Sequence, residues 1–170
     1  LMMENAAQDL ESCVMPHVFH ESSRYINRPC VLILAGRGNN GADGYALARR
    51  LSCHDFCVAV CCIGEPSSEI AKVQKKRAEL LGVSFISPYD LDSFAEEKSF
   101  DISVVVDCVY GSGFHLPLDA ESEAVIQSAN KIEAFKVSCD VPSGLDSDGN
   151  GKIVFRADET VAMGALKLSL

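Results

Sequence analysis

The sequence is short of positive charge. Among its 170 residues, 15 are Lys or Arg and 24 are Asp or Glu, which gives a formal net charge of −9 and a pI of about 4.8. Non-specific nucleic-acid binding and attachment to a membrane surface both depend on clustered basic side chains. We therefore expect no nucleic-acid partner. An acidic protein that binds a polyanion needs a local source of positive charge, such as a helix N-terminus, a bound cation or a few suitably placed Lys or Arg residues.

Two further patterns are missing. No apolar run is long enough to cross a bilayer, so we expect no membrane partner. No cysteine pair has the CxxC spacing and the four histidines are scattered, which argues against a zinc site of the usual kind. Most of the eight cysteines lie in or beside apolar runs, where a reduced Cys acts as a small hydrophobe; these are Cys57, Cys61, Cys62, Cys108 and Cys139. This pattern predicts a reducing, cytoplasmic compartment.

The length and the 48% apolar content predict one packed domain over residues 1–170. The first residues, LMMENAAQDLESC, are amphipathic and carry acids early, unlike a signal peptide. The sequence opens inside an apparent helix and stops on the apolar LKLSL. We therefore expect the domain to be truncated at both ends.

Short apolar runs alternate with segments of helical periodicity. CVLILA (30–35) and FCVAVCCI (56–63) are typical of strands buried on both faces of a sheet. Strands are expected at 30–35, 56–63, 83–86, 102–106, 135–139 and 159–162, and helices at 2–25, 42–51, 67–81, 91–98 and 120–134. Pro16 is expected to kink or split the first helix. The alternation implies βαβ units and a mostly parallel sheet covered on both sides by helices.

A Gly-rich segment, GRGNNGADG (36–44), separates the first expected strand from a helix. Its glycines fit the GxGxxG pattern, which lets backbone N–H groups approach a phosphate. The alternative is a plain strand-to-helix turn capped by Asn39 or Asn40, but that does not explain two adjacent Asn residues together with Asp43. The acid that binds a ribose is expected about 20 residues further on, where Glu65 is a weak match. The segment is therefore unlike that of an ordinary dehydrogenase.

Three later segments also follow the ends of expected strands. DCVYGSGFHLPL begins at Asp107, and DVPSG begins at Asp140, whose carboxylate should point out from the strand end because the residue before a proline is held extended. Each acid alone could simply cap a turn. In AMGALK, Lys167 could meet a phosphate or remain a solvated surface lysine.

Taken together, these segments predict a site at one edge of the sheet, because ligands bind beyond the carboxyl ends of parallel strands. Asn40, Asp107 and Ser143 are expected to converge there. One carboxylate with two neutral oxygen-bearing groups suits a hard, singly charged cation better than zinc.

These residues resemble a known family, the YjeF N-terminal domain or NAD(P)H-hydrate epimerase family. The resemblance runs in order through LMMENAA, VLILAGRGNNGADGYALARRL, VVVDCVYGSGF, VSCDVPSGLDSDGNG and ADETVAMGALK. It implies an α/β, three-layer αβα sandwich of Rossmann-like type. It also implies an isomerase that interconverts the R and S epimers of NADHX and NADPHX, nicotinamide cofactors hydrated at ring carbon 6, so that a dehydratase can restore them.

The resemblance further implies a potassium ion, a homodimer, and a dehydratase that is fused to the domain or cooperates with it. Carried over by motif, the potassium ligands are Asn40, Asp107 and Ser143. The substrate-binding residues implied are Asn39, Asn40, Gly41, Ala42, Asp43, Gly111, Ser112, Gly113, Phe114, His115, Leu116, Pro117 and Asp140.

The reaction itself needs a group that gives and takes a proton, whether the hydroxide leaves and returns or the ring opens and closes. We expect Asp140 to be this catalytic residue, with Asp43 as its rival. The sequence departs from the family at GADG, where GGDG is usual, so the methyl group of Ala42 is expected where backbone approaches substrate. In FHLPL, His115 is the one side chain that could be positive.

Two other functions fit parts of the pattern. The same fold serves as a non-catalytic, dimerising scaffold that can bind nucleotides, but such relatives tend to lose the potassium-site residues, which are present here. An ordinary NAD-dependent oxidoreductase would need a good ribose acid and a His or Tyr in a proton relay, and the sequence offers neither.

Overall fold

A computed structural model describes residues 2–20, 27–146 and 148–163 and contains one six-stranded sheet. Every neighbouring pair of strands is parallel, in the order β3-β2-β1-β4-β5-β6. The strands are β1 (Arg28–Ala35), β2 (Cys57–Cys62), β3 (Ser84–Ile86), β4 (Phe100–Cys108), β5 (Phe135–Cys139) and β6 (Glu159–Val161). The expected parallel sheet is confirmed, and its strands lie close to the predicted ranges.

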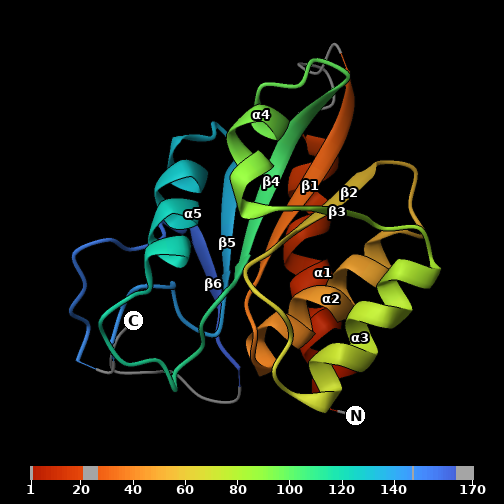
Figure 1. Cartoon of the computed structure of the whole chain (residues 1–170). Coiled ribbons are helices and arrows are strands. Elements are labelled where there is room, and N and C mark those ends of the chain that lie inside the picture. Colours follow the sequence, from red (N-terminus) through yellow and green to blue (C-terminus); the bar gives the residue numbers. More distant parts are fainter. Residues whose placement is uncertain (1, 21–26, 147, 164–170) are drawn as a thin grey trace.

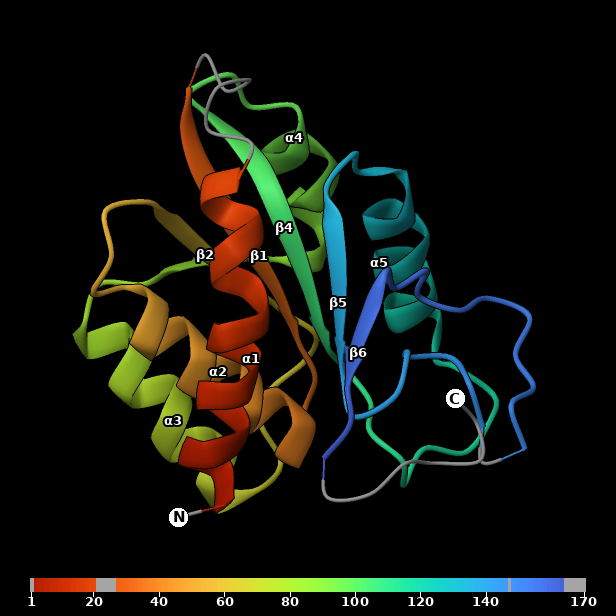
Figure 2. The ribbon, with the colours of Figure 1, turned by 180° about the vertical axis from the view of Figure 1, so that it is seen from behind.

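Helices cover both faces of the sheet, as Figures 1 and 2 show from opposite sides. They are α1 (Met2–His20), α2 (Asn39–Leu51), α3 (Glu69–Leu80), α4 (Leu91–Ala95) and α5 (Ala120–Lys131), with a short 3-10 helix at Pro88–Asp90. One core packs the sheet against α1, α2 and α3, and the other packs it against α4 and α5. The three-layer αβα, Rossmann-like architecture is thereby confirmed.

Strand β1 shows why the sheet sits between two cores. Successive side chains of a strand point to opposite faces. Val31 and Ile33 accordingly belong to the core under α1 and α2, whereas Leu32 and Leu34 belong to the core under α4 and α5. All four side chains are fully buried, as the continuous apolar run predicts for a central parallel strand.

Some helix boundaries differ from those expected. Helix α1 runs unbroken past Pro16 to His20, so the proline does not split it. Helix α2 begins three residues early, with Gly38 as N-cap and no side-chain cap. Helix α3 is capped by Ser68, whose Oγ accepts a hydrogen bond from the Ala71 N–H at 3.2 Å. The early start of α2 places Asn39 and Asn40 on its first turn rather than in the preceding loop.

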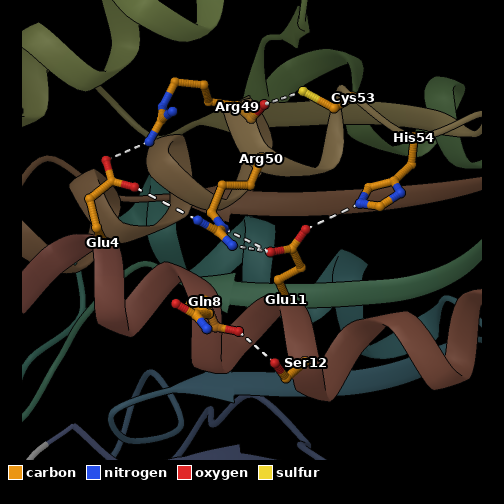
Figure 3. A network of polar contacts seen from close by, with 8 residues as sticks. All are labelled: Glu4, Gln8, Glu11, Ser12, Arg49, Arg50, Cys53 and His54. Atoms are coloured by element: carbon orange, nitrogen blue, oxygen red, sulfur yellow. Dashed lines mark hydrogen bonds and ion pairs between the residues drawn. The ribbon is translucent and has the colours of Figure 1, made fainter.

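Ionic contacts tie α1 to α2 (Figure 3). The Glu4 carboxylate pairs with Arg49, and the Glu11 carboxylate accepts a 2.7 Å hydrogen bond from Arg50 Nε. His54 Nε2 lies 3.1 Å from the other Glu11 oxygen. The two glutamates share one face of α1, and this network holds that face against the C-terminal end of α2.

Two features concern the cysteines and the lengths of the helices. All eight cysteines are free thiols, and Cys30, Cys61, Cys108 and Cys139 are buried in the cores. Within residues 2–20, 27–146 and 148–163, no helix combines the length and the apolar character that a membrane crossing requires.

The order of the strands places a crevice beside β1. This strand pairs with β2 on one side and with β4 on the other. The chain leaves β1 for α2 on one face of the sheet, and leaves β4 for α5 on the opposite face (Figures 1 and 2). In open α/β sheets such a reversal opens a crevice at the carboxyl ends of the strands, where ligands bind.

Candidate functional site

A pocket of about 530 Å³ lies at this reversal point, within the usual size range of small-molecule sites. The loop after β1, the first turn of α2, the segment after β4 and the end of β5 form its walls. Eight of the residues predicted to bind substrate line it: Asn39, Asn40, Asp43, Gly111, Ser112, Gly113, Phe114 and Asp140. The structure thus brings together segments that lie about 100 residues apart in the sequence, such as those of Asn39 and Asp140.

The loops after β1 and β4 are in direct contact at the base of the pocket. The Gly36 N–H donates to the Cys108 carbonyl at 3.0 Å. A Cβ atom at Gly36 would lie 2.1 Å from the Val109 carbonyl oxygen, which no real side chain tolerates. The first glycine of the Gly-rich segment is therefore required by the approach of the neighbouring loop, before any ligand is considered.

The three predicted cation ligands are connected through the backbone of one residue, Tyr110, and through Ser143. Asn40 Nδ2 donates to the Tyr110 carbonyl at 2.8 Å and to the Cys139 carbonyl at 3.3 Å. Ser143 Oγ accepts from the Tyr110 N–H at 2.9 Å and donates to Asp107 Oδ1 at 2.7 Å. Asn40, Asp107 and Ser143 thus form one connected cluster.

Asp107 is the fully buried acid of this cluster. Its Oδ2 accepts from the Ser143 N–H at 2.7 Å, and its Oδ1 accepts from the Val109 N–H at 3.1 Å. Burial raises the pKa of Asp107 to about 6, although the hydrogen bonds from Ser143 and Val109 act in the opposite direction. No described Lys, Arg or His forms an ion pair with it. The cluster therefore concentrates oxygen atoms and negative charge without a protein cation.

This donor set fits a hard monovalent cation. It offers one carboxylate, one hydroxyl, one amide and the carbonyls of Tyr110 and Cys139, which are the oxygen ligands that such ions take. Among the described residues no group of three or more His, Cys, Asp or Glu side chains is placed to hold a metal. The Asn40 amide nitrogen now bridges the two carbonyls. Rotation of that amide would turn its oxygen toward them, an arrangement that only a cation between them would stabilise.

Asp140 owes its orientation to an unusual backbone. Its φ is +69°, in the left-handed region that Asp tolerates better than most side chains do. The expectation that an extended backbone directs this carboxylate is wrong, because Val141, not Asp140, directly precedes Pro142. Asp140 Oδ2 accepts from the Ser112 N–H at 2.7 Å, and Oδ1 accepts from the Met163 N–H at 3.4 Å. The carboxylate nonetheless lines the pocket, as predicted.

Asp43 is the second acid that lines the pocket. It lies on α2, one turn after Asn40. Burial raises the pKa of Asp43 to about 7, and the negative charge of Asp140 adds to the rise. A carboxyl group that titrates near neutral pH is well suited to proton transfer.

Several predicted residues do not reach the pocket wall. Gly41 and Ala42 are buried, and Ala42 belongs to the core under α1 and α2. Its methyl group therefore faces the core rather than the substrate, contrary to the expectation. His115, Leu116 and Pro117 are exposed beyond the lining segment, and Lys167 lies outside the described residues.

Three residues that line the pocket, Arg37, Tyr110 and Met163, are not among those predicted from the sequence. Arg37 stands inside the Gly-rich segment and could have been noticed there as a cation next to the glycines. No sequence signal marks Met163, because its place depends on β6 pairing with β5.

Comparisons with known proteins agree with this architecture. A family model described as YjeF-related protein N-terminus matches residues 1–169. The bifunctional NAD(P)H-hydrate repair enzyme Nnr of Helicobacter pylori is 37% identical over all of this chain, which spans only 34% of that enzyme. The NAD(P)H-hydrate epimerase of Oenococcus oeni is 36% identical over 87% of this chain and 69% of its own length. The crystal structure of yeast YNL200c superposes with a TM-score of 0.83 at 22% identity, covering 99% of this chain and 72% of that one, and so shares the fold.

Proposed function

This chain belongs to the family of YjeF-related protein N-terminal domains, and we propose that it is an isomerase, an NAD(P)H-hydrate epimerase that interconverts the R and S epimers of NADHX and NADPHX. Relatives that carry this name support the reaction. The observation that carries the proposal is the pocket at the end of β1, where Asp43 and Asp140 line the wall above the cluster of Asn40, Asp107 and Ser143.

The residues lining the pocket divide into those that bind and those that move a proton. Asn39, Asn40 and Asp43 on the first turn of α2 hold the substrate together with the segment from Gly111 to Phe114. Asp140 gives and takes the proton at the hydrated ring, since two backbone N–H groups fix its carboxylate. Asp43 is the alternative proton carrier because its pKa lies near neutral pH. Either epimerisation route, hydroxide exchange or ring opening, needs such a group.

Potassium is the second part of the proposal. Asn40, Asp107 and Ser143 would hold the ion, together with backbone carbonyls of the same cluster. When bound, it would supply a fixed positive charge next to a phosphate or the carboxamide of the substrate. In a protein of net charge −9 this would offset the repulsion of an anionic substrate.

The partners and the compartment form the third part of the proposal. The chain spans about a third of the bifunctional Helicobacter pylori enzyme. We therefore propose that it cooperates with, or is joined to, the dehydratase that the family resemblance implies, and that it acts as a homodimer. Its buried, reduced cysteines support a reducing, cytoplasmic compartment.

The experiment that tests the proposal starts from pure R-NADHX. The protein is added in potassium buffer and formation of the S epimer is followed by chromatography. The assay is repeated in sodium buffer and with Asp107→Asn. The proposal predicts conversion that is fastest with potassium and intact Asp107. If a well-folded wild-type protein converts neither NADHX nor NADPHX, the non-catalytic scaffold becomes the better account.

A further inference from the structure

The pocket has a marked division of charge. Its two carboxylates, Asp43 and Asp140, come from α2 and the end of β5. Among the described residues that line it, Arg37 is the one with a positively charged side chain. A dinucleotide carries its negative charge on phosphate groups, whereas its hydrated nicotinamide ring is uncharged. The ring therefore suits the acidic part of the pocket, and a phosphate group suits the part next to Arg37.

The backbone of Arg37 is held in place by the segment that follows β2. Its carbonyl accepts hydrogen bonds from the Ser67 N–H at 2.8 Å and from Ser67 Oγ at 3.0 Å. The guanidinium lies against Gly64, where a Cβ atom would come within 2.1 Å of Arg37 Nε. Gly64 also has a φ of +68°, which favours glycine. The end of β2 thus leaves room for the arginine head group.

The charged head of Arg37 is only loosely engaged. Among the described residues, the acid that pairs with it is Glu121 on α5, with Nη2 3.6 Å from Glu121 Oε2, beyond normal hydrogen-bond distance. The Arg37 side chain is 54% exposed and that of Glu121 is 29% exposed. An exposed ion pair of this geometry contributes little stability. Most of the five N–H donors of the guanidinium therefore remain available to a stronger acceptor.

The place of Arg37 in the fold matches this chemistry. It lies in the turn after β1 and reaches over the end of β2. In dinucleotide-binding sheets this corner holds the adenosine ribose, and an arginine there accommodates a 2′-phosphate. Guanidinium groups bind phosphate through two parallel charge-assisted hydrogen bonds.

Building on the epimerase function proposed above, we propose that Arg37 binds a phosphate group of the substrate; where that group is the 2′-phosphate, Arg37 also sets the preference for NADPHX over NADHX. Glu121 competes with that phosphate for the guanidinium. The two sources of phosphate are the diphosphate, which both substrates carry, and the 2′-phosphate, which NADPHX alone carries.

The test measures KM and kcat of the whole protein on NADPHX and on NADHX. Arg37→Ala is expected to raise KM about tenfold or more, with a smaller change in kcat, because a charge-assisted contact is lost. A rise in KM for NADPHX alone identifies the 2′-phosphate as the group that Arg37 binds. An equal rise in KM for both substrates identifies the diphosphate. Glu121→Gln is expected to lower the same KM, and Arg37→Lys to fall between wild type and Arg37→Ala.

Two controls distinguish failure of the Arg37 proposal from failure of the proposed epimerase function. Arg77→Ala removes the same charge from an exposed position on α3 and is expected to leave both KM values unchanged. Binding of NADPHX and NADHX is also measured by calorimetry, which needs no turnover. An active wild type with an Arg37→Ala variant of unchanged KM and affinity overturns the role of Arg37 alone. A wild type that binds neither hydrate overturns both proposals.

Discussion

Asp43 and Asp140 line the same pocket, close enough for the charge of Asp140 to add to the effect of burial on the pKa of Asp43. The two acids come from different elements, α2 and the end of β5, and only the strand order of the sheet brings them together. A pocket that holds two carboxyl groups near one hydrated ring is equipped for proton transfer, and it is also costly to fold when both groups are charged.

The free-energy cost of burying the ionised Asp43 carboxylate gives a pH-dependent prediction for stability. Its folded pKa of about 7 lies above its ordinary value of 3.8, so its contribution to the free energy of unfolding is intact at low pH and is lost as pH rises toward and through 7. Asp43→Asn removes this loss. The variant is expected to exceed wild type by on the order of 1 kcal/mol at pH 8, after allowance for solvent screening, and to match it near pH 4. Urea denaturation at both pH values measures the difference.

Asp148→Asn serves as the control for that experiment, since Asp148 is an exposed acid in a turn. It should change stability little at either pH. Equal stability of Asp43→Asn and wild type at pH 8 would show that burial of this carboxylate is not costly, and the near-neutral titration of Asp43 would have to be abandoned.

The cation cluster gives a prediction that separates binding from folding. Ser143→Ala removes both the hydroxyl that donates to Asp107 and the acceptor for the Tyr110 N–H. We expect a loss of about 1–3 kcal/mol in unfolding free energy and a several-fold higher potassium concentration for half-maximal activity. Titration of activity with potassium at constant ionic strength measures the second effect.

Ser103→Ala is the matched variant for this comparison. Ser103, like Ser143, is buried. It lies on β4 and donates one hydrogen bond, to the Cys30 carbonyl at 3.2 Å, but it lies toward the end of β4 that is away from Asp107. It should lose stability while its potassium dependence stays that of wild type. If both serine variants respond alike to potassium, Ser143 is a folding residue and not an ion ligand.

The contact between α1 and α2 predicts sensitivity to acid. Burial alone would raise the pKa of Glu11, but hydrogen bonds from His54 and Arg50 outweigh it and lower the pKa below its ordinary value of 4.5. The stabilising contribution of Glu11 is therefore present above pH 4.5 and is lost as pH falls through the folded pKa. Glu11→Gln should cost about 1 kcal/mol near pH 7 and little near pH 3, as judged by thermal unfolding.

Glu79→Gln provides the comparison, because Glu79 pairs with Lys76 at 3.5 Å on the exposed face of α3. A surface pair of this kind contributes little, so this variant should unfold like wild type at both pH values. A Glu11→Gln variant indistinguishable from Glu79→Gln would mean that the network in Figure 3 does not hold α1 in place.

The sequence was most informative where local pattern and tertiary structure agree. The run from Cys30 to Ala35 predicts a central strand because each face of it meets a core. The motifs after β1, β4 and β5 likewise predict convergence, since parallel strands end at one edge of the sheet. The sequence predicts too late a start for α2 because Asn39 and Asn40 resemble cap residues, whereas Gly38 occupies the N-cap.

What the sequence could not reveal depends on contacts between distant segments. The left-handed backbone of Asp140 accompanies hydrogen bonds to Ser112 and to Val161, which pattern alone does not foresee. The inward direction of the Ala42 methyl group follows from how α2 packs on the sheet. The orientation of Arg37 depends on Gly64, at the end of a different strand.

The central claim is that this pocket epimerises a hydrated nicotinamide cofactor, and equilibration from both sides tests it most directly. Pure R-NADHX and pure S-NADHX are incubated separately with protein in potassium, and the ratio of epimers is followed by chromatography. An epimerase changes rates and not equilibria, so both samples should converge on the same ratio much faster than without protein, and Asp140→Asn should slow both directions by about 100-fold or more. Failure of wild type to speed convergence, or undiminished rates in both Asp140→Asn and Asp43→Asn, would contradict the account.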